Sequence, residues 1–154
     1  MAQTEQKLAE LGLQLPVLGA PKGNYLPALR VGELLFVSGQ LPLKDGACLF
    51  TGPVGGERTI EEGQAAARQC ALNALAVIKA ALGSFEAVGQ IVSVTGYVLG
   101  VPLFSQSPAV INGASDLLVA VLGDRGRHTR AAVSVSGLPL NATVEISVVV
   151  QVRI

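Results

Sequence analysis

The chain has 154 residues, of which 50% are hydrophobic and only 14% are charged, and its eleven basic and eleven acidic side chains give zero net charge. Since an average domain carries about 25% charged residues, we expect a soluble chain this apolar to cover part of its surface with copies of itself. The zero net charge and a sequence pI of about 6.6 argue against nucleic acid or an anionic membrane as a partner of the whole chain.

The N-terminal 24 residues are expected to extend a single domain that spans residues 1–154. Residues 4–12 predict a short amphipathic helix with Leu8, Leu11 and Leu13 inward, and the prolines that follow predict an irregular entry. This segment is too polar for a signal peptide and too acidic for a transit peptide, so cytoplasm is the expected location. No run approaches the roughly 18 apolar residues of a membrane span.

A strand is expected over residues 34–38, followed by a turn at Ser38-Gly39-Gln40 and a reversal at residues 44–46, "KDG". Residues 51–59 are rich in Gly and Pro and predict a loop. Thr59 and Glu62 form a capping box for a helix that should end at Gly83. Cys48 and Cys70 have no metal-ligand spacing, and we expect two reduced thiols and no metal site.

The next strand is expected over residues 91–98, and Ser107-Pro108 should open a second helix that ends at Gly123. The last segment, "RAAVSVSGLPLNATVEISVVVQVRI", reads as a β-hairpin. The resulting order, β-β-α-β-α-β-β, predicts an α+β domain with two helices on one face of a sheet.

Two opposite charges, Arg130 and Glu145, interrupt the strand sequence of this hairpin. Residue alternation predicts that both lie on its polar side, opposite a row of valines and Ile146. A guanidinium can hold a carboxylate through two parallel hydrogen bonds. On the residues alone, Arg130 is equally consistent with a ligand site and with a cross-strand ion pair to Glu145.

These segments together resemble the RidA/YjgF family, also called the endoribonuclease L-PSP or translation-inhibitor family. The resemblance covers residues from about Tyr25 to the C-terminus. It rests on Tyr25 thirteen residues before Ser38, the "SGQ" turn, the helix "GQAAARQCALNALAVIKA", and Arg130 and Glu145 around "LPLNATVEI".

The resemblance implies a chorismate-mutase-like fold, a homotrimer with clefts between subunits, and hydrolysis of 2-imino acids to 2-oxo acids and ammonia. Arg130 would then hold the substrate carboxylate, and Glu145 would activate water or brace Arg130. Tyr25, Ser38 and Gly39 would line the cleft, although Tyr25 could equally be a surface ring and Ser38-Gly39 a strand-ending turn. No cofactor is implied.

The sequence departs from many relatives near Arg130. His128 and Ala132 stand where those relatives have proline and cysteine, and Val101 and Pro102 stand where polar residues are usual. A more apolar pocket wall is therefore expected. His128 is the only histidine and is interpreted as a solvated loop residue beside the basic residues Arg125 and Arg127.

Two other functions stay open at this stage. One is a non-catalytic module that senses a small carboxylate, which would need Arg130 but not Glu145. The other is the ribonuclease activity of the family's older label, and a single histidine with few aromatic residues argues against it.

Overall fold

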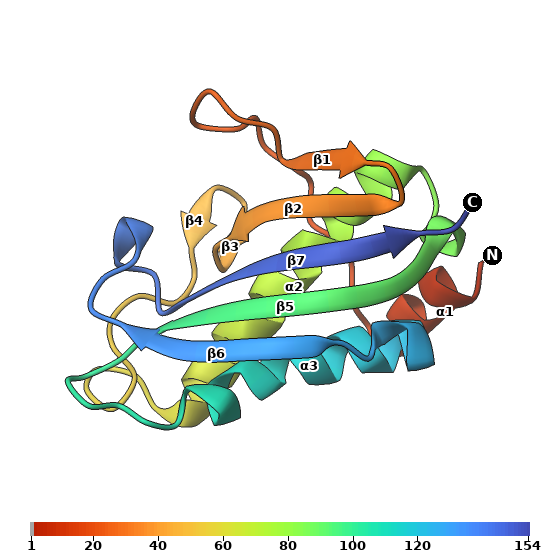
Figure 1. The fold of residues 1–154 in the computed structure, drawn as a ribbon. Helices are drawn as coiled ribbons and strands as arrows, with labels where there is room; N and C mark the ends of the chain where they lie inside the picture. Colours follow the sequence, from red (N-terminus) through yellow and green to blue (C-terminus); the bar gives the residue numbers. More distant parts are fainter. Residues whose placement is uncertain (1) are drawn as a thin grey trace.

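The computed structural model describes residues 2–154 and shows a curved sheet backed by helices (Figure 1). The elements follow in the order α1 (Gln3–Glu10), β1 (Ala28–Val31), β2 (Leu34–Gln40), β3 (Leu43–Lys44), β4 (Ala47–Cys48), α2 (Ile60–Leu82), β5 (Val88–Leu99), α3 (Ser107–Leu122), β6 (Thr129–Val135) and β7 (Val144–Val152). Short 3₁₀ turns lie at Phe85–Ala87, Gly123–Gly126 and Pro139–Asn141.

The main sheet has five strands in the order β1-β2-β7-β5-β6, and β3 and β4 form a separate two-stranded ribbon. Neighbouring strands are antiparallel except β5 and β6, which are parallel. The long helices α2 and α3 lie behind this sheet, and its front face carries no helix (Figure 1). The α+β class and the placement of two helices on one face are therefore confirmed.

Helix α2 begins and ends where its sequence signals predict. The Thr59 hydroxyl accepts from the Glu62 backbone N–H while the Glu62 carboxylate accepts from the Thr59 N–H. That backbone hydrogen bond and the nearby Arg58 lower the pKa of the Glu62 carboxyl. At the other end Gly83 adopts the left-handed conformation, φ 80°, and closes the helix.

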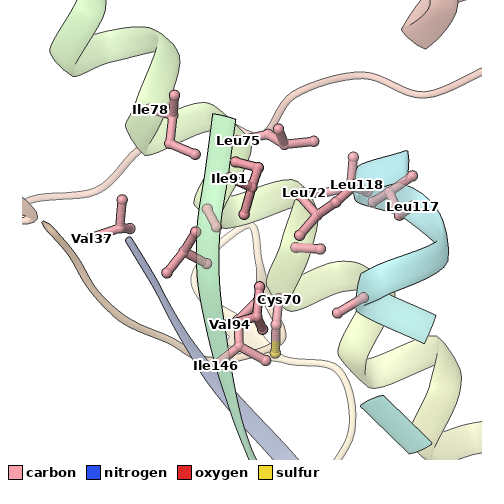
Figure 2. Close-up of a cluster of buried hydrophobic side chains, with 14 of the residues drawn as sticks. Val37, Cys70, Leu72, Leu75, Ile78, Ile91, Val94, Leu117, Leu118 and Ile146 are labelled. Atoms are coloured by element: carbon pink, nitrogen blue, oxygen red, sulfur yellow. The ribbon is translucent and has the colours of Figure 1, made fainter. Parts of the chain in front are cut away.

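The buried side chains form one hydrophobic cluster between α2, α3 and the inner face of the sheet (Figure 2). Ile78 and Leu75 of α2 meet Ile91 and Val94 of β5, and Leu118 packs from α3. Helix α2 is long and apolar enough to cross a membrane, but 61% of its most apolar window is buried inside the fold. It is the core helix of this structure.

The N-terminal region contains one expected element and one unexpected one. Helix α1 lies where the short amphipathic helix was predicted and buries Leu8, but Leu11 is 43% exposed, so its predicted inward position is wrong. Strand β1 falls in the segment expected to be irregular. It pairs with β2 through a two-residue turn in which Gly32 has φ 61°.

The predicted C-terminal hairpin is wrong, because β5 lies between β6 and β7. Helix α3 carries the chain back along the sheet, so β6 runs parallel to β5 at the sheet edge. Strand β7 then lies between β5 and β2 and pairs with both. Strand alternation fixes which side chains share a face, but it carries no information on which strands are neighbours.

Candidate functional site at the sheet edge

Arg130 lies on edge strand β6 and points to the helix side of the sheet. Its register partner is Val94, which is buried in the core. The Arg130 Nη1 atom donates to Asn112 Oδ1 at 2.8 Å and to Ser115 Oγ at 3.2 Å. Both partners belong to α3, so the guanidinium is anchored between the edge strand and this helix.

Helix α3 presents these partners because Asn112 and Ser115 are three residues apart and share one face. The adjoining face of α3 is buried through Ile111, Leu117 and Leu118. Neither polar residue was among the predicted site residues. Their signal was available, since they are polar positions with helical spacing in an otherwise apolar helix.

His128 belongs to the same hydrogen-bonded chain. Its Nδ1 lies 2.6 Å from the Gly126 carbonyl oxygen, and its Nε2 lies 2.9 Å from Ser115 Oγ. A carbonyl only accepts, so Nδ1 carries a proton, and in the neutral ring Nε2 accepts from the Ser115 hydroxyl. Because the Ser115 hydroxyl hydrogen then points to His128, the Ser115 oxygen can accept the hydrogen bond from Arg130 Nη1. His128 is therefore a partly buried, bonded residue, which corrects its interpretation as a solvated loop residue.

An open hollow of about 260 Å³ adjoins this chain of hydrogen bonds and is lined by Ser115, Val119, Arg127, His128 and Arg130. Within the described chain, the Nε and Nη2 atoms of Arg130 have no hydrogen-bond partner, and the side chain is exposed. These N–H groups remain available for a carboxylate or another planar anion.

Glu145 lies on the opposite face of the sheet. Its register partner is Tyr97, three residues along β5 from Val94, so its side chain points to the face that carries no helix. Within residues 2–154 its carboxylate makes no ion pair, and partial burial raises its pKa. The expected shared polar side for Arg130 and Glu145 is therefore wrong within one chain.

The segment predicted to contribute Ser38 and Gly39 lies next to Glu145. Pairing between β2 and β7 advances from Val37 opposite Val148 to Gln40 opposite Ile146, so β2 holds one extra residue in a β-bulge. The expected strand-ending turn is thus a bulge inside β2. A Cβ on Gly39 would collide with Glu145 Oε1, so a larger residue here would force this carboxylate out of its present position.

Ser38 ties this bulge to the loop that carries Tyr25. The Ser38 hydroxyl donates to the Leu26 carbonyl at 2.6 Å, and its backbone N–H donates to Pro27 at 2.9 Å. Tyr25 itself is 56% exposed. The structure thus brings Ser38, Gly39 and Glu145 together, with Tyr25 in the adjoining loop, and keeps Arg130 on the other face of the sheet.

The residues that depart from the family pattern lie in two places: His128 and Ala132 flank Arg130, whereas the Val101 N–H donates to the Val54 carbonyl in the loop before α2. Ala132, two residues after Arg130, packs partly buried against the core. Leu103, after Val101 and Pro102 in the β5–α3 loop, is 99% exposed with φ 66°. Among residues 2–154, no cluster of three His, Cys, Asp or Glu side chains could hold a metal ion.

The sequence of this chain matches a known protein family and a relative of similar length. The family model described as "YjgF/chorismate_mutase-like, putative endoribonuclease" matches residues 5–152. Protein TCP17 of Trypanosoma cruzi is 44% identical over 147 residues, which cover 95% of this chain and 92% of that protein.

Solved structures agree with this match. The protein Atu1372 of unknown function from Agrobacterium tumefaciens aligns with a TM-score of 0.91 and 44% identity, covering 98% of this chain and 94% of that one. A structure from Shewanella oneidensis, described as a putative endoribonuclease, aligns with a TM-score of 0.94 and 35% identity over 97% and 99% of the two chains. E. coli TdcF with bound serine shares the fold, with a TM-score of 0.64 and 22% identity over 92% and 96%.

Proposed function

The chain belongs to the YjgF/chorismate-mutase-like family, and we propose that it is an enamine/imine deaminase that hydrolyses reactive 2-imino acids to 2-oxo acids and ammonia. The observation that carries the proposal is Arg130. This guanidinium is anchored by α3 on one side and has unengaged N–H groups beside an open hollow on the other. It is suited to hold the carboxylate common to all 2-imino acids.

The proposed chemistry needs one water and one base. Water attacks C2 of the protonated imine, and a carboxylate takes the water proton. The carboxyl group then returns this proton to the nitrogen of the tetrahedral adduct, and ammonia leaves as the adduct hydroxyl loses its proton to give the 2-oxo acid. Glu145 is the proposed base. Its raised pKa brings it closer to neutral pH than an exposed carboxylate, as a general base requires. Tyr25, Ser38 and Gly39 would line the substrate site beside it.

Because Arg130 and Glu145 point to opposite faces of one sheet, we propose that two copies of the chain build each site. Arg130 of one copy would face Glu145 of its neighbour across a cleft, in a homotrimer. The face without helices supports association, since it exposes the apolar side chains Leu29, Val31, Leu34, Phe36 and Val133. Patches of this kind mark interfaces in soluble proteins.

The test is hydrolysis of 2-iminobutanoate and 2-iminopropanoate generated in situ. Loss of the Arg130 hydrogen bonds to a charged carboxylate is worth about 1.5–3 kcal/mol. Arg130→Ala should therefore lower kcat/KM about 10- to 100-fold. Arg68→Ala is the matched control, because Arg68 is exposed on α2 and outside the site. Absence of acceleration by folded wild-type protein would refute the deaminase proposal.

A non-catalytic carboxylate sensor is the second candidate. The structure of TdcF with bound serine provides one relative of this fold that holds a small amino acid. Such a sensor would need Arg130 alone. It would be favoured if Glu145→Gln kept the affinity for small 2-oxo acids and no imino acid were ever turned over by the wild type.

Ribonuclease activity, which the family description carries, is the third candidate. Metal-independent RNA cleavage needs an acid and a base around a phosphate, but the only histidine uses both ring nitrogens in hydrogen bonds to Ser115 and Gly126. Cleavage activity that persisted through successive purification steps and fell in Arg130→Ala would support this candidate against our proposal.

A further inference from the structure

We propose that the hollow between α3 and β6 binds small ligands that carry two anionic groups, with Arg130 holding one group and Arg127 holding the other. The inference rests on the carboxylate-binding role of Arg130 in the proposed function and specifies the substrate class. That class is 2-imino acids, or the 2-oxo acids derived from them, with a second carboxylate or a phosphate on the side chain.

The shape of the hollow is the first observation. Its volume of about 260 Å³ is several times the roughly 30 Å³ that one water occupies in the liquid. Both guanidinium-bearing residues line it, although they belong to different elements, since Arg127 follows the 3₁₀ turn and Arg130 lies in β6. A ligand in this space therefore meets two permanent positive charges.

The second observation is that both guanidiniums keep free donors. Arg130 uses only Nη1 within the described residues, and Arg127 uses only Nε, at 3.2 Å from Asp124 Oδ1. Each guanidinium has five N–H donors in total. The Arg127–Asp124 ion pair is open to solvent, with the side chains 71% and 97% exposed, and pairs of this kind contribute little. Arg127 can therefore turn toward a ligand at small cost.

The third observation is the absence of negative charge in the lining. Besides the two arginines it consists of Ser115, Val119 and His128. Ser115 and His128 are engaged with each other, so neither opposes an incoming anion. A monoacid would satisfy one guanidinium and leave the other paired only with solvent or Asp124. A diacid satisfies both.

The experiment compares equilibrium binding of 2-oxobutanoate, 2-oxoglutarate and 2-phosphoglycolate to the full chain by titration calorimetry. An exposed charge pair contributes up to about 1 kcal/mol, so the doubly charged ligands should bind about fivefold tighter than 2-oxobutanoate at low salt. A tighter complex with 2-oxoglutarate than with 2-phosphoglycolate would assign the second group as a carboxylate, and the reverse would assign it as a phosphate.

Three variants decide the inference. Arg127→Gln should bring the affinity for the doubly charged ligands down to about that of 2-oxobutanoate, and Arg127→Lys should keep part of the preference because it retains the charge. Arg68→Gln, which changes an exposed arginine on α2, should change none of the affinities.

Failure of this inference is distinguishable from failure of the proposed function. Equal affinity for mono- and dianionic ligands in the wild type, or a preference that survives Arg127→Gln, would overturn the inference while leaving Arg130 as the carboxylate ligand. If Arg130→Gln bound all three ligands as tightly as wild type, the carboxylate role of Arg130 would fall, and the inference would fall with it.

Discussion

Glu145 combines partial burial with a carboxylate that has no cation near it in the described part of the chain. Burial raises its pKa, because the charged form loses hydration without gaining a partner. The folded chain therefore binds a proton more tightly at this site than the unfolded chain does. As the pH rises from the ordinary carboxyl pKa to the raised pKa of Glu145 in the folded chain, the contribution of Glu145 lowers the free energy of unfolding.

Glu145→Gln should for that reason stabilise the fold at neutral pH. The gain over wild type should be present at about pH 7 and should shrink on acidification, vanishing at about pH 3.5, below the ordinary carboxyl pKa. Urea denaturation at both pH values measures the difference. The lowered pKa of Glu62 makes both proteins lose stability on acidification. Subtracting the free energy of unfolding of wild type from that of the variant at each pH cancels this contribution.

Glu33→Gln serves as the matched control, since Glu33 is exposed in the β1–β2 turn. A Glu145→Gln protein less stable than wild type at neutral pH would mean that a cation outside this chain, such as Arg130 of a neighbouring copy, pairs with the carboxylate directly and not across a cleft. Glu145 could be predicted as a candidate site residue from the sequence, because it is a charged residue within a predicted strand. Its raised pKa could not be predicted, since it depends on what β2 places beside the side chain.

At the scale of elements, helices α2 and α3 approach each other closely at Gly113. A Cβ at this position would overlap the backbone carbonyl of Gln64 on α2. In an exposed helix, alanine in place of glycine stabilises the helix by about 1 kcal/mol. Overpacking against a neighbouring backbone destabilises the fold by about 1–3 kcal/mol, because the backbone cannot rotate away as a side chain can.

Gly113→Ala should therefore lower the free energy of unfolding, by up to about 2 kcal/mol net. Chemical denaturation measures it, with Gly137→Ala as the control because nothing lies within 4 Å of a Cβ there. A gain in stability in Gly113→Ala would show that the two helices separate easily. Since α3 also carries Asn112 and Ser115, a shifted helix should weaken 2-oxobutanoate binding through Arg130.

The elements predicted from local signals were largely correct, and the errors concern relations between elements. The capping box at Thr59 and the glycine stop at Gly83 act within a few residues, so the sequence determines them directly. The neighbour of β6 is decided by the path of α3 across the sheet, which no local pattern records. Arg130 was identified by its charge and by family resemblance, but its α3 partners depend on that same path.

For the whole molecule, the decisive relation is that Arg130 and Glu145 point to opposite faces of one sheet. If both residues act on one substrate, each site must take Arg130 from one copy and Glu145 from another. As homomers, Arg130→Ala and Glu145→Gln should each lose most of the wild-type activity, Arg130→Ala by about 10- to 100-fold. A mixture of the two, unfolded together and refolded, should regain activity, because some interfaces then join an intact Arg130 to an intact Glu145.

With equal amounts and random assembly in a closed ring, about a quarter of the interfaces combine the two intact residues. Imine hydrolysis by the mixture should therefore recover to about a quarter of the wild-type rate, while the double variant mixed with itself should recover none. Sedimentation of the refolded mixture confirms that the oligomer has re-formed. Recovery absent from a properly assembled mixture would mean that Arg130 and Glu145 do not serve a common site between copies, and that Glu145 is not the base.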